Sequence, residues 1–181
     1  MLRILNKIRK TGVVTEPFDL SPEIAELGQV LKREIQAQFK RSLSIRQVDA
    51  GSCNGCELEI NALNNPLYDI ERFGVRFVAS PRHADVLLVT GPVSRHMESA
   101  LRRTFRATPS PKYVIASGDC ACHGGEFGVS YASRGAVENV IPVDFKIPGC
   151  PPSPTQLIKG LLAMLLSGDA SIHESASSIE K

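Results

Sequence analysis

Apolar residues recur at helical spacing between residues 22 and 40 and form one continuous stripe. The stripe consists of Ile24, Leu27, Leu31, Ile35 and Phe39. A Ser21-Pro22 pair stands at its start, which is typical of a helix that begins with a capping residue and has proline at its first position. We therefore expect a helix over residues 22–40 whose apolar face packs on a core or an interface.

Residues 1–10 have a basic amphipathic pattern. Leucines and isoleucines alternate with cations in this segment, and no acidic residue precedes Glu16. Such a pattern suits an anionic membrane surface or a neighbouring subunit, and a simple frayed terminus explains it equally well. Residues 11–21 contain Gly12 and Pro17 and are predicted to be a linker.

From residue 43 the pattern changes to short β-branched runs separated by helical stretches. Strands are predicted at 43–48, 75–78, 86–89 and 113–116, and helices at 57–63, 94–107 and 154–166. Alternation of strands and helices indicates parallel pairing with crossover helices. The predicted fold class is α/β, a small flavodoxin-like doubly wound parallel sheet with an N-terminal helical extension.

Three segments follow from this pattern. Residues 1–42 are the N-terminal amphipathic segment and helix, residues 43–166 are the flavodoxin-like domain, and residues 167–181 are a Ser-, Ala- and Glu-rich tail predicted to be disordered. In sheets of this type ligands bind outside the carboxyl ends of the strands. The loops after the first and fourth predicted strands should therefore meet at one edge.

The composition of the chain disfavours several classes of protein function. The chain has 181 residues, 43% hydrophobic and 22% charged, with a formal charge of +2, so nothing favours a nucleic-acid partner. No secretory signal opens the sequence, and the longest apolar run, residues 161–166, is too short to span a bilayer. We expect a cytoplasmic protein whose membrane association is peripheral or through a partner.

Cysteines carry the clearest chemical signal. Four of the five, Cys53, Cys56, Cys120 and Cys150, lie in Gly- or Pro-rich turns, after short apolar runs or before a predicted helix. In a reducing cytosol such cysteines are more often metal ligands than disulfide partners. A Cys-x-x-Cys pair alone is compatible with a redox dithiol, a zinc site or an iron-sulfur cluster.

The spacing of the whole set favours the cluster. Zinc sites commonly combine two close Cys-x-x-Cys pairs, whereas this set is one pair and two distant single cysteines. Such a set suits a 4Fe-4S cluster, whose irons accept thiolates from several directions. We expect one 4Fe-4S cluster. A structural zinc interaction module without redox activity is the alternative from another class, and a flavin-binding flavodoxin is disfavoured because a cysteine loop replaces the phosphate loop.

Several motifs together resemble a known family, the iron-sulfur subunit shared by the complex I 20 kDa (B-type) subunit and by membrane-bound, energy-converting nickel-iron hydrogenases of the formate hydrogenlyase type. The resemblance covers roughly residues 45–165. Its carriers are Gly51-Ser52-Cys53-Asn54-Gly55-Cys56 with Glu59, Ser80-Pro81-Arg82-His83-Ala84-Asp85, Gly118-Asp119-Cys120-Ala121 with Gly124-Gly125, Ile141-Pro142-Val143-Asp144, and Pro148-Gly149-Cys150-Pro151-Pro152.

This resemblance implies that Cys53, Cys56, Cys120 and Cys150 bind the cluster nearest the catalytic site of a larger subunit. The implied partners are a large nickel-iron or quinone-site catalytic subunit, a ferredoxin-like 4Fe-4S subunit and integral membrane subunits, with attachment to the inner face of the cell membrane. Complex I proteins typically have adjacent cysteines where this chain has Cys-x-x-Cys, so the hydrogenase branch is favoured. A B-type complex I subunit that passes electrons to quinone is the alternative.

Other residues near the motifs have less certain roles. The motif aligns Cys120 as the ligand and leaves Cys122 as an extra thiol, expected to be buried, beside a non-ligand His123. Glu59 is a possible proton relay. Glu57 is the alternative to Glu59 for relaying protons or for holding a neighbouring loop near the cluster, and an exposed carboxylate in the first turn of a helix explains it at least as well. Two arginines, Arg82 and Arg134, face either the partner and the cluster or solvent.

Overall fold

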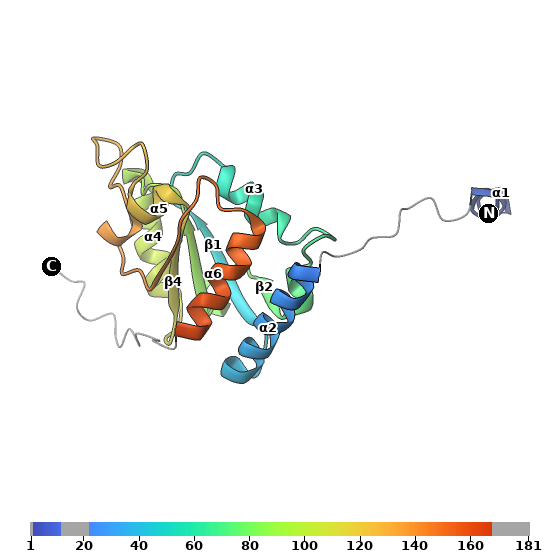
Figure 1. Cartoon of the computed structure of the whole chain (residues 1–181). Helices are drawn as coiled ribbons and strands as arrows, with labels where there is room; N and C mark the ends of the chain where they lie inside the picture. Colours follow the sequence, from blue (N-terminus) through green and yellow to red (C-terminus); the bar gives the residue numbers. More distant parts are fainter. Residues whose placement is uncertain (1, 12–21, 168–181) are drawn as a thin grey trace.

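Five parallel strands form the centre of the protein in the order β2-β1-β3-β4-β5 (Figure 1). The computed structural model describes residues 2–11 and 22–167. The strands are β1 (Leu43–Asp49), β2 (Val75–Phe77), β3 (Val86–Thr90), β4 (Tyr113–Ser117) and β5 (Phe145–Ile147). This order, in which the chain crosses to one side of β1 and then to the other, is that of a flavodoxin-like doubly wound sheet, so the predicted fold class is confirmed.

Helices cover both faces of the sheet (Figure 1). One face packs against α2 (Pro22–Phe39), α3 (Gly55–Ala62) and α6 (Pro154–Ser167), and the other against α4 (Arg95–Ala107) and α5 (Asp119–His123). Short 3-10 turns lie at η1 (Ile70–Phe73), η2 (Pro81–His83) and η3 (Val137–Asn139). Each group of helices packs on one face of the sheet, so the protein has two separate apolar cores, one on each side of the strands.

The central strand shows why the sheet folds this way. In β3, Val86 and Leu88 point into the core under α2, α3 and α6, while Leu87 and Val89 point into the core under α4 and α5. All four side chains are buried. A strand covered on both faces needs a continuous apolar run, which is the pattern that parallel sheets show.

The N-terminal segment contains a helix, α1 (Leu2–Thr11). Its apolar residues Ile4, Leu5 and Ile8 are 66%, 60% and 62% exposed. Among the described residues, no helix combines the length and the apolar character that crossing a bilayer requires. The predicted linker beyond Thr11 and the predicted tail beyond Ser167 lie outside the described residues.

One strand was not predicted. A long loop was expected between the strand at 113–116 and the last helix, but β5 (Phe145–Ile147) pairs with β4 there. Apolar and polar residues alternate over residues 143–147, a short strand pattern that ends at Pro148 and that the prediction did not use. Its position at the sheet edge matters because Cys150 follows it.

Candidate metal centre

The four predicted cysteine ligands lie at the carboxyl edge of the sheet. Cys53 is in the loop after β1, and Cys56 is in the first turn of α3. Cys120 is in the first turn of α5, after β4, and Cys150 follows β5. All four thiols are free. Because the strands are parallel, all of these loops emerge on the same side of the sheet.

Reciprocal hydrogen bonds join the loops after β4 and β5. The Asp119 backbone N–H donates to the Gly149 carbonyl at 2.8 Å, and the Gly149 N–H donates to the Asp119 carboxylate at 2.8 Å. Each of these residues directly precedes a cysteine. The pair of bonds therefore holds Cys120 and Cys150 next to each other.

Two glycines lie directly against cysteine sulfurs. A β-carbon on Gly118 would lie 2.6 Å from the Cys56 Sγ, and one on Gly125 would lie 2.7 Å from the Cys120 Sγ. Real β-carbons do not approach other atoms so closely. The two glycines also have φ angles of +90° and +54°, which disfavour any other residue. The sulfurs thus sit in a cradle that a side chain at either position would fill.

The loop after β1 also reaches the segment that follows β5. At Gly55, the β-carbon position lies 3.6 Å from the Cys53 Sγ and 3.8 Å from the Pro151 Cγ. Pro151 is the neighbour of Cys150. The contacts at Gly55 and Gly118, taken together, bring the four cysteines from separate loops to one place at the sheet edge.

Two carboxylates, one buried and one exposed, fix the loop that carries Cys53. The Glu57 carboxylate is 7% exposed and accepts hydrogen bonds from the Ser52 hydroxyl, at 2.5 Å, and from the Thr90 hydroxyl at the end of β3. The Asp49 carboxylate accepts from the backbone N–H groups of Gly51 and Ser52, both at 2.8 Å. Of the two interpretations of Glu57, the exposed carboxylate is wrong, and the two acceptor oxygens instead tie the loop to the sheet.

The sequence left the role of Glu57 open and did not identify its partners. The available signal was the pair of hydroxyl residues, Ser52 and Thr90, each placed where a strand ends. Their proximity depends on the pairing of β1 with β3, which sets Asp49 beside Thr90 and is not written in either segment alone.

The electrostatics of the cysteine set favour a bound cation. Burial raises the pKa of Cys56 to about 12, with further upward contributions from Glu57 and from Cys53, Cys120 and Cys150. The pKa of Cys120 is also raised, first by burial and then by Cys150 and Cys53. Thiolates at these positions repel one another, and a positively charged centre bound by them offsets that repulsion.

Within residues 2–11 and 22–167, no three His, Cys, Asp or Glu side chains are grouped closely enough to hold one metal ion.

One buried hydroxyl at this edge has no partner among the described residues. Ser117, the last residue of β4, is fully buried, and its Oγ makes no hydrogen bond. It directly precedes Gly118, against which the Cys56 sulfur lies. A free donor beside the thiols suits a ligand that accepts hydrogen bonds, as the sulfides of an iron-sulfur cluster do.

The extra cysteine points away from this group. Cys122 is 4% exposed and lies in the core under α4 and α5, as expected. Its thiol donates to the carbonyls of Ala116 at 3.4 Å and Ile147 at 3.5 Å. Burial raises its pKa to about 11. His123 is exposed, with its Nε2 3.8 Å from the Asp119 carboxylate.

The other residues singled out in the sequence are Glu59, Arg82 and Arg134, and they lie in different parts of the fold. Glu59 is half-buried on α3. Arg82 is exposed in η2, before β3, so it lies at the opposite edge of the sheet and does not face the cysteines. There it lines a cavity of about 490 Å³ beside the buried Asp85, which accepts from Arg41 at 2.6 Å. Arg134 forms an ion pair with Glu98 of α4 at 2.6 Å.

Fold and site together define a flavodoxin-like domain with a cysteine-lined edge. The sequence profile of one family, described as the 20 kDa subunit of NADH ubiquinone oxidoreductase, matches residues 53–164. That match covers more than half of the chain and contains all four cysteines. The chain belongs to this family.

Individual relatives come from both branches of the predicted resemblance. Formate hydrogenlyase subunit 7 of Escherichia coli K12 is 41% identical over 165 residues, which are 91% of this chain and 63% of the relative. The probable membrane-bound hydrogenase subunit mbhJ of Pyrococcus furiosus is 46% identical over 125 residues, 69% of this chain and 75% of the relative. The B subunit of NADH-quinone oxidoreductase from Desulfovibrio desulfuricans is 45% identical over 109 residues, 60% of this chain and 59% of the relative.

A solved structure also matches. It is that of the membrane-bound sulfane sulfur reductase, an archaeal respiratory membrane complex, and the matching chain has a TM-score of 0.63 and 34% identity. The match covers 75% of this chain and 77% of that one. The chain spans less than two thirds of the length of two of the relatives above, the formate hydrogenlyase and the NADH-quinone oxidoreductase subunits.

Proposed function

We propose that this chain is an electron-transfer subunit that carries one 4Fe-4S cluster next to the catalytic site of a larger partner. Cys53, Cys56, Cys120 and Cys150 are the four ligands in this proposal. Their convergence from the loops after β1, β4 and β5 is the observation that carries it. When bound, the cluster supplies one-electron redox chemistry.

The surrounding residues prepare the edge for such a group. Gly118 and Gly125 leave room at the sulfurs of Cys56 and Cys120. Asp49 and Glu57 hold the loop of Cys53 through buried or backbone hydrogen bonds. A site fixed in this way keeps its ligands in place between oxidation states, which lowers the cost of electron transfer.

We further propose that the chain works within a membrane-associated nickel-iron hydrogenase complex. The proposed partners are a large nickel-iron subunit, a ferredoxin-like 4Fe-4S subunit and integral membrane subunits, with this chain at the cytoplasmic face. The hydrogenase names of two relatives support the proposal, as does the Cys53-x-x-Cys56 spacing. Glu59, half-buried on α3 near Cys56, is the proposed proton relay.

A B-type subunit that passes electrons toward quinone is the second candidate. The 45% identity to the NADH-quinone oxidoreductase relative favours it. Metal analysis of the complex that co-purifies with this chain separates the two candidates. Nickel bound in the large subunit supports hydrogenase, whereas a nickel-free complex that reduces quinone contradicts it.

Anaerobic purification tests the cluster itself. We expect about four irons and four sulfides per chain, a broad visible absorption from thiolate-to-iron charge transfer, and an EPR signal on reduction. A colourless chain with one zinc ion would overturn the proposal in favour of the structural zinc module.

A further inference from the structure

The outer face of α4 carries a row of arginines that the proposed electron transfer does not use. Arg95, Arg102, Arg103 and Arg106 line a shallow cavity of about 420 Å³ together with Glu98 and Ser99. The opposite side of the helix is apolar and packs into the core through Leu101 and Phe105. One face of α4 thus holds the fold together and the other presents guanidinium groups to the surroundings.

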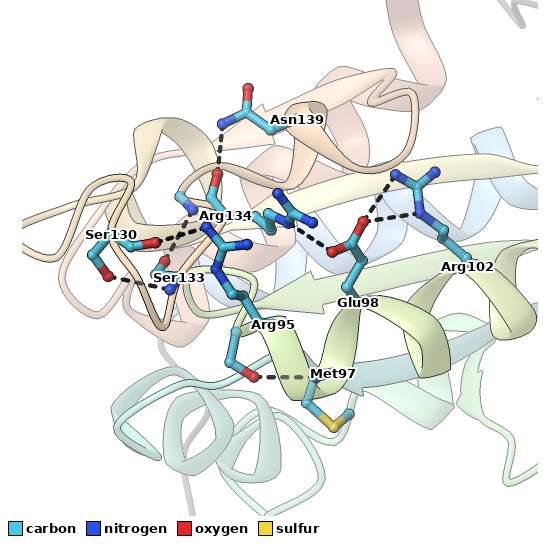
Figure 2. A network of polar contacts seen from close by, with 10 residues as sticks. Arg95, Met97, Glu98, Arg102, Ser130, Ser133, Arg134 and Asn139 are labelled. Carbon is cyan, nitrogen blue, oxygen red and sulfur yellow. Dashed lines mark hydrogen bonds and ion pairs between the residues drawn. The ribbon is translucent and has the colours of Figure 1, made fainter. Parts of the chain in front are cut away.

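A single carboxylate organises part of this row, as Figure 2 shows. Glu98 accepts from Arg134 Nε at 2.6 Å and from Arg102 at 3.2 Å, so it holds two guanidinium groups in fixed positions. Arg134 comes from the loop before η3 and brings a fifth arginine to the same face. Five arginines and one glutamate give this face a formal charge of +4, twice the +2 of the whole chain.

Three of the arginines form no ion pair within the described residues. The Arg95 guanidinium donates to the Ser130 backbone carbonyl, whereas Arg103 and Arg106 are exposed and have no side-chain partner among those residues. Fixed positive charge without compensation lowers the stability of the isolated chain slightly through repulsion. A binding partner with negative charge would offset that repulsion.

An exposed aromatic loop continues the arginine row. Phe127 and Tyr131 are 64% and 93% exposed. The loop is attached to α4 at Arg95, whose backbone N–H donates to the Ala132 carbonyl at 2.9 Å and whose guanidinium donates to the Ser130 carbonyl at 3.2 Å (Figure 2). Arginine, tyrosine and phenylalanine are among the residues that protein interfaces favour most strongly.

We propose that this surface, made of Arg95, Arg102, Arg103, Arg106, Arg134, Phe127 and Tyr131, docks an acidic face of another protein subunit. We call it the α4 docking surface. The proposal rests on the proposed function, in which this chain is part of a multi-subunit complex. It adds the site on this chain at which one partner binds and the negative charge of the partner's surface. Carboxylates of the partner pair with Arg103 and Arg106, and its apolar side chains pack on Phe127.

An apolar pocket beside the loop supports a protein as the occupant. The pocket has a volume of about 220 Å³, and its lining includes Phe127, Pro92 and Ala132. A lipid headgroup or a nucleic-acid phosphate pairs with the arginines but offers no small apolar side chain for this pocket. A folded partner with both acidic and apolar residues matches the charged and the apolar part together.

Charge reversal in the purified complex tests the surface. The double variant Arg103→Glu with Arg106→Glu is compared with Lys32→Glu with Arg33→Glu, which changes the same charge on exposed residues of α2. The complex is captured through this chain, and the NaCl concentration at which partners dissociate is measured. We expect the α4 variant to dissociate at an NaCl concentration at least about twofold lower than the parent, and the α2 variant to match the parent.

Photocross-linking identifies the occupant. Arg103 is replaced by a benzoyl-phenylalanine residue in the assembled complex, and the adducts are mapped by mass spectrometry. An adduct with an Asp- and Glu-rich segment of another subunit supports the proposal. Adducts with lipid or nucleic acid alone, or equal salt resistance of the α4 variant and the parent, overturn it. If the parent chain purifies without partners, the proposed complex itself is contradicted. The EPR signal of the proposed cluster is also recorded in the α4 variant, and a signal equal to that of the parent shows that the two substitutions affect docking and leave the cluster intact.

Discussion

The Cys56 sulfur lies against the backbone of Gly118, so close that a β-carbon there would approach it to 2.6 Å. Gly118 therefore sets the position of a proposed ligand from across the sheet edge. We expect Gly118→Ala to displace the Cys56 thiol and to reduce the iron content to less than about half of the parent value, because one of four ligands is lost. Iron and sulfide analysis after anaerobic purification measures this effect.

Gly128→Ala is the matched control for that variant. Gly128 also has a positive φ, +51°, but nothing lies within 4 Å of its β-carbon position. Alanine is strained at both positions. The cost is about 1–2 kcal/mol for an ordinary positive φ, and it is larger at Gly118, whose φ of +90° and ψ of +155° are adopted essentially by glycine alone. If Gly128→Ala loses as much iron as Gly118→Ala, backbone strain and not the contact with Cys56 is the cause.

Removal of individual thiols separates ligands from the buried cysteine. We expect Cys56→Ala to abolish the intact 4Fe-4S EPR signal, since the proposed cluster needs four thiolates. Cys122→Ala should retain the signal and lower the free energy of unfolding by about 1 kcal/mol, because its thiol fills a core site away from the edge. EPR and denaturant unfolding measure the two effects, and loss of the signal in Cys122→Ala would reassign the ligand set.

The neighbouring carboxylates Glu57 and Glu59 should respond differently to the same change. Glu57→Gln replaces one acceptor oxygen with an NH2 donor, so the hydroxyl of either Ser52 or Thr90 loses its acceptor and must turn to accept instead. With the charge of the carboxylate also lost, we expect a loss of about 2–3 kcal/mol in unfolding free energy. Glu59→Gln, on a half-buried site, should cost less than about 0.5 kcal/mol. Equal losses in urea unfolding would contradict the anchoring role of Glu57.

The unpartnered Ser117 hydroxyl should affect the reduction potential. A hydrogen bond to a cluster sulfur stabilises the reduced state, because reduction adds negative charge. One bond worth about 0.5–1.5 kcal/mol corresponds to about 20–60 mV in a one-electron couple. We expect Ser117→Ala to lower the potential by that amount in an EPR-monitored redox titration. An unchanged potential would mean that the hydroxyl does not reach the cluster.

Acid should weaken the ion pairs of Glu98 with Arg134 and Arg102 inside the α4 docking surface. A hydrogen bond from Arg134 is the largest cause that lowers the pKa of Glu98 below its usual value of 4.5, and Arg102 lowers it further. A lowered carboxyl pKa contributes stability that is present above the usual pKa and is lost as pH falls through the lowered one. For a largely exposed pair the contribution is at most about 1 kcal/mol.

Glu98→Gln reveals this contribution. The difference in unfolding free energy between parent and Glu98→Gln should be largest near about pH 7 and should shrink as pH falls below the usual carboxyl pKa and through the lowered pKa of Glu98. Any effect of acid on the cysteine site is shared by both proteins, and this shared effect cancels when the unfolding free energy of one protein is subtracted from that of the other at each pH. A difference that stays constant over this range would show that Glu98 acts by packing and not by charge.

Much of the fold was readable from the sequence because its strands and helices obey local patterns. The helix over residues 22–40 and four of the five strands follow from local patterns, and the structure shows them with nearly the same bounds. The edge strand β5 (Phe145–Ile147) was not predicted, although residues 143–147 alternate apolar and polar side chains. Such a short pattern next to prolines is weak by itself, and its pairing with β4 in tertiary context makes it a strand.

The candidate site was also predictable only in part. Cysteines in Gly- and Pro-rich turns were recognisable because their spacing and neighbours reflect ligand chemistry. The roles of Glu57 and of Gly118 were not, because each depends on a contact with a residue far away in the sequence, Thr90 in one case and Cys56 in the other. Such contacts are fixed by strand order and register, which single segments do not encode.

The bonds between Asp119 and Gly149 also link the proposed ligand set to completion of the sheet. They join the loop of Cys120 to the loop of Cys150, which follows β5. A chain in which β5 has not yet paired with β4 therefore lacks the arrangement that brings the proposed ligands together.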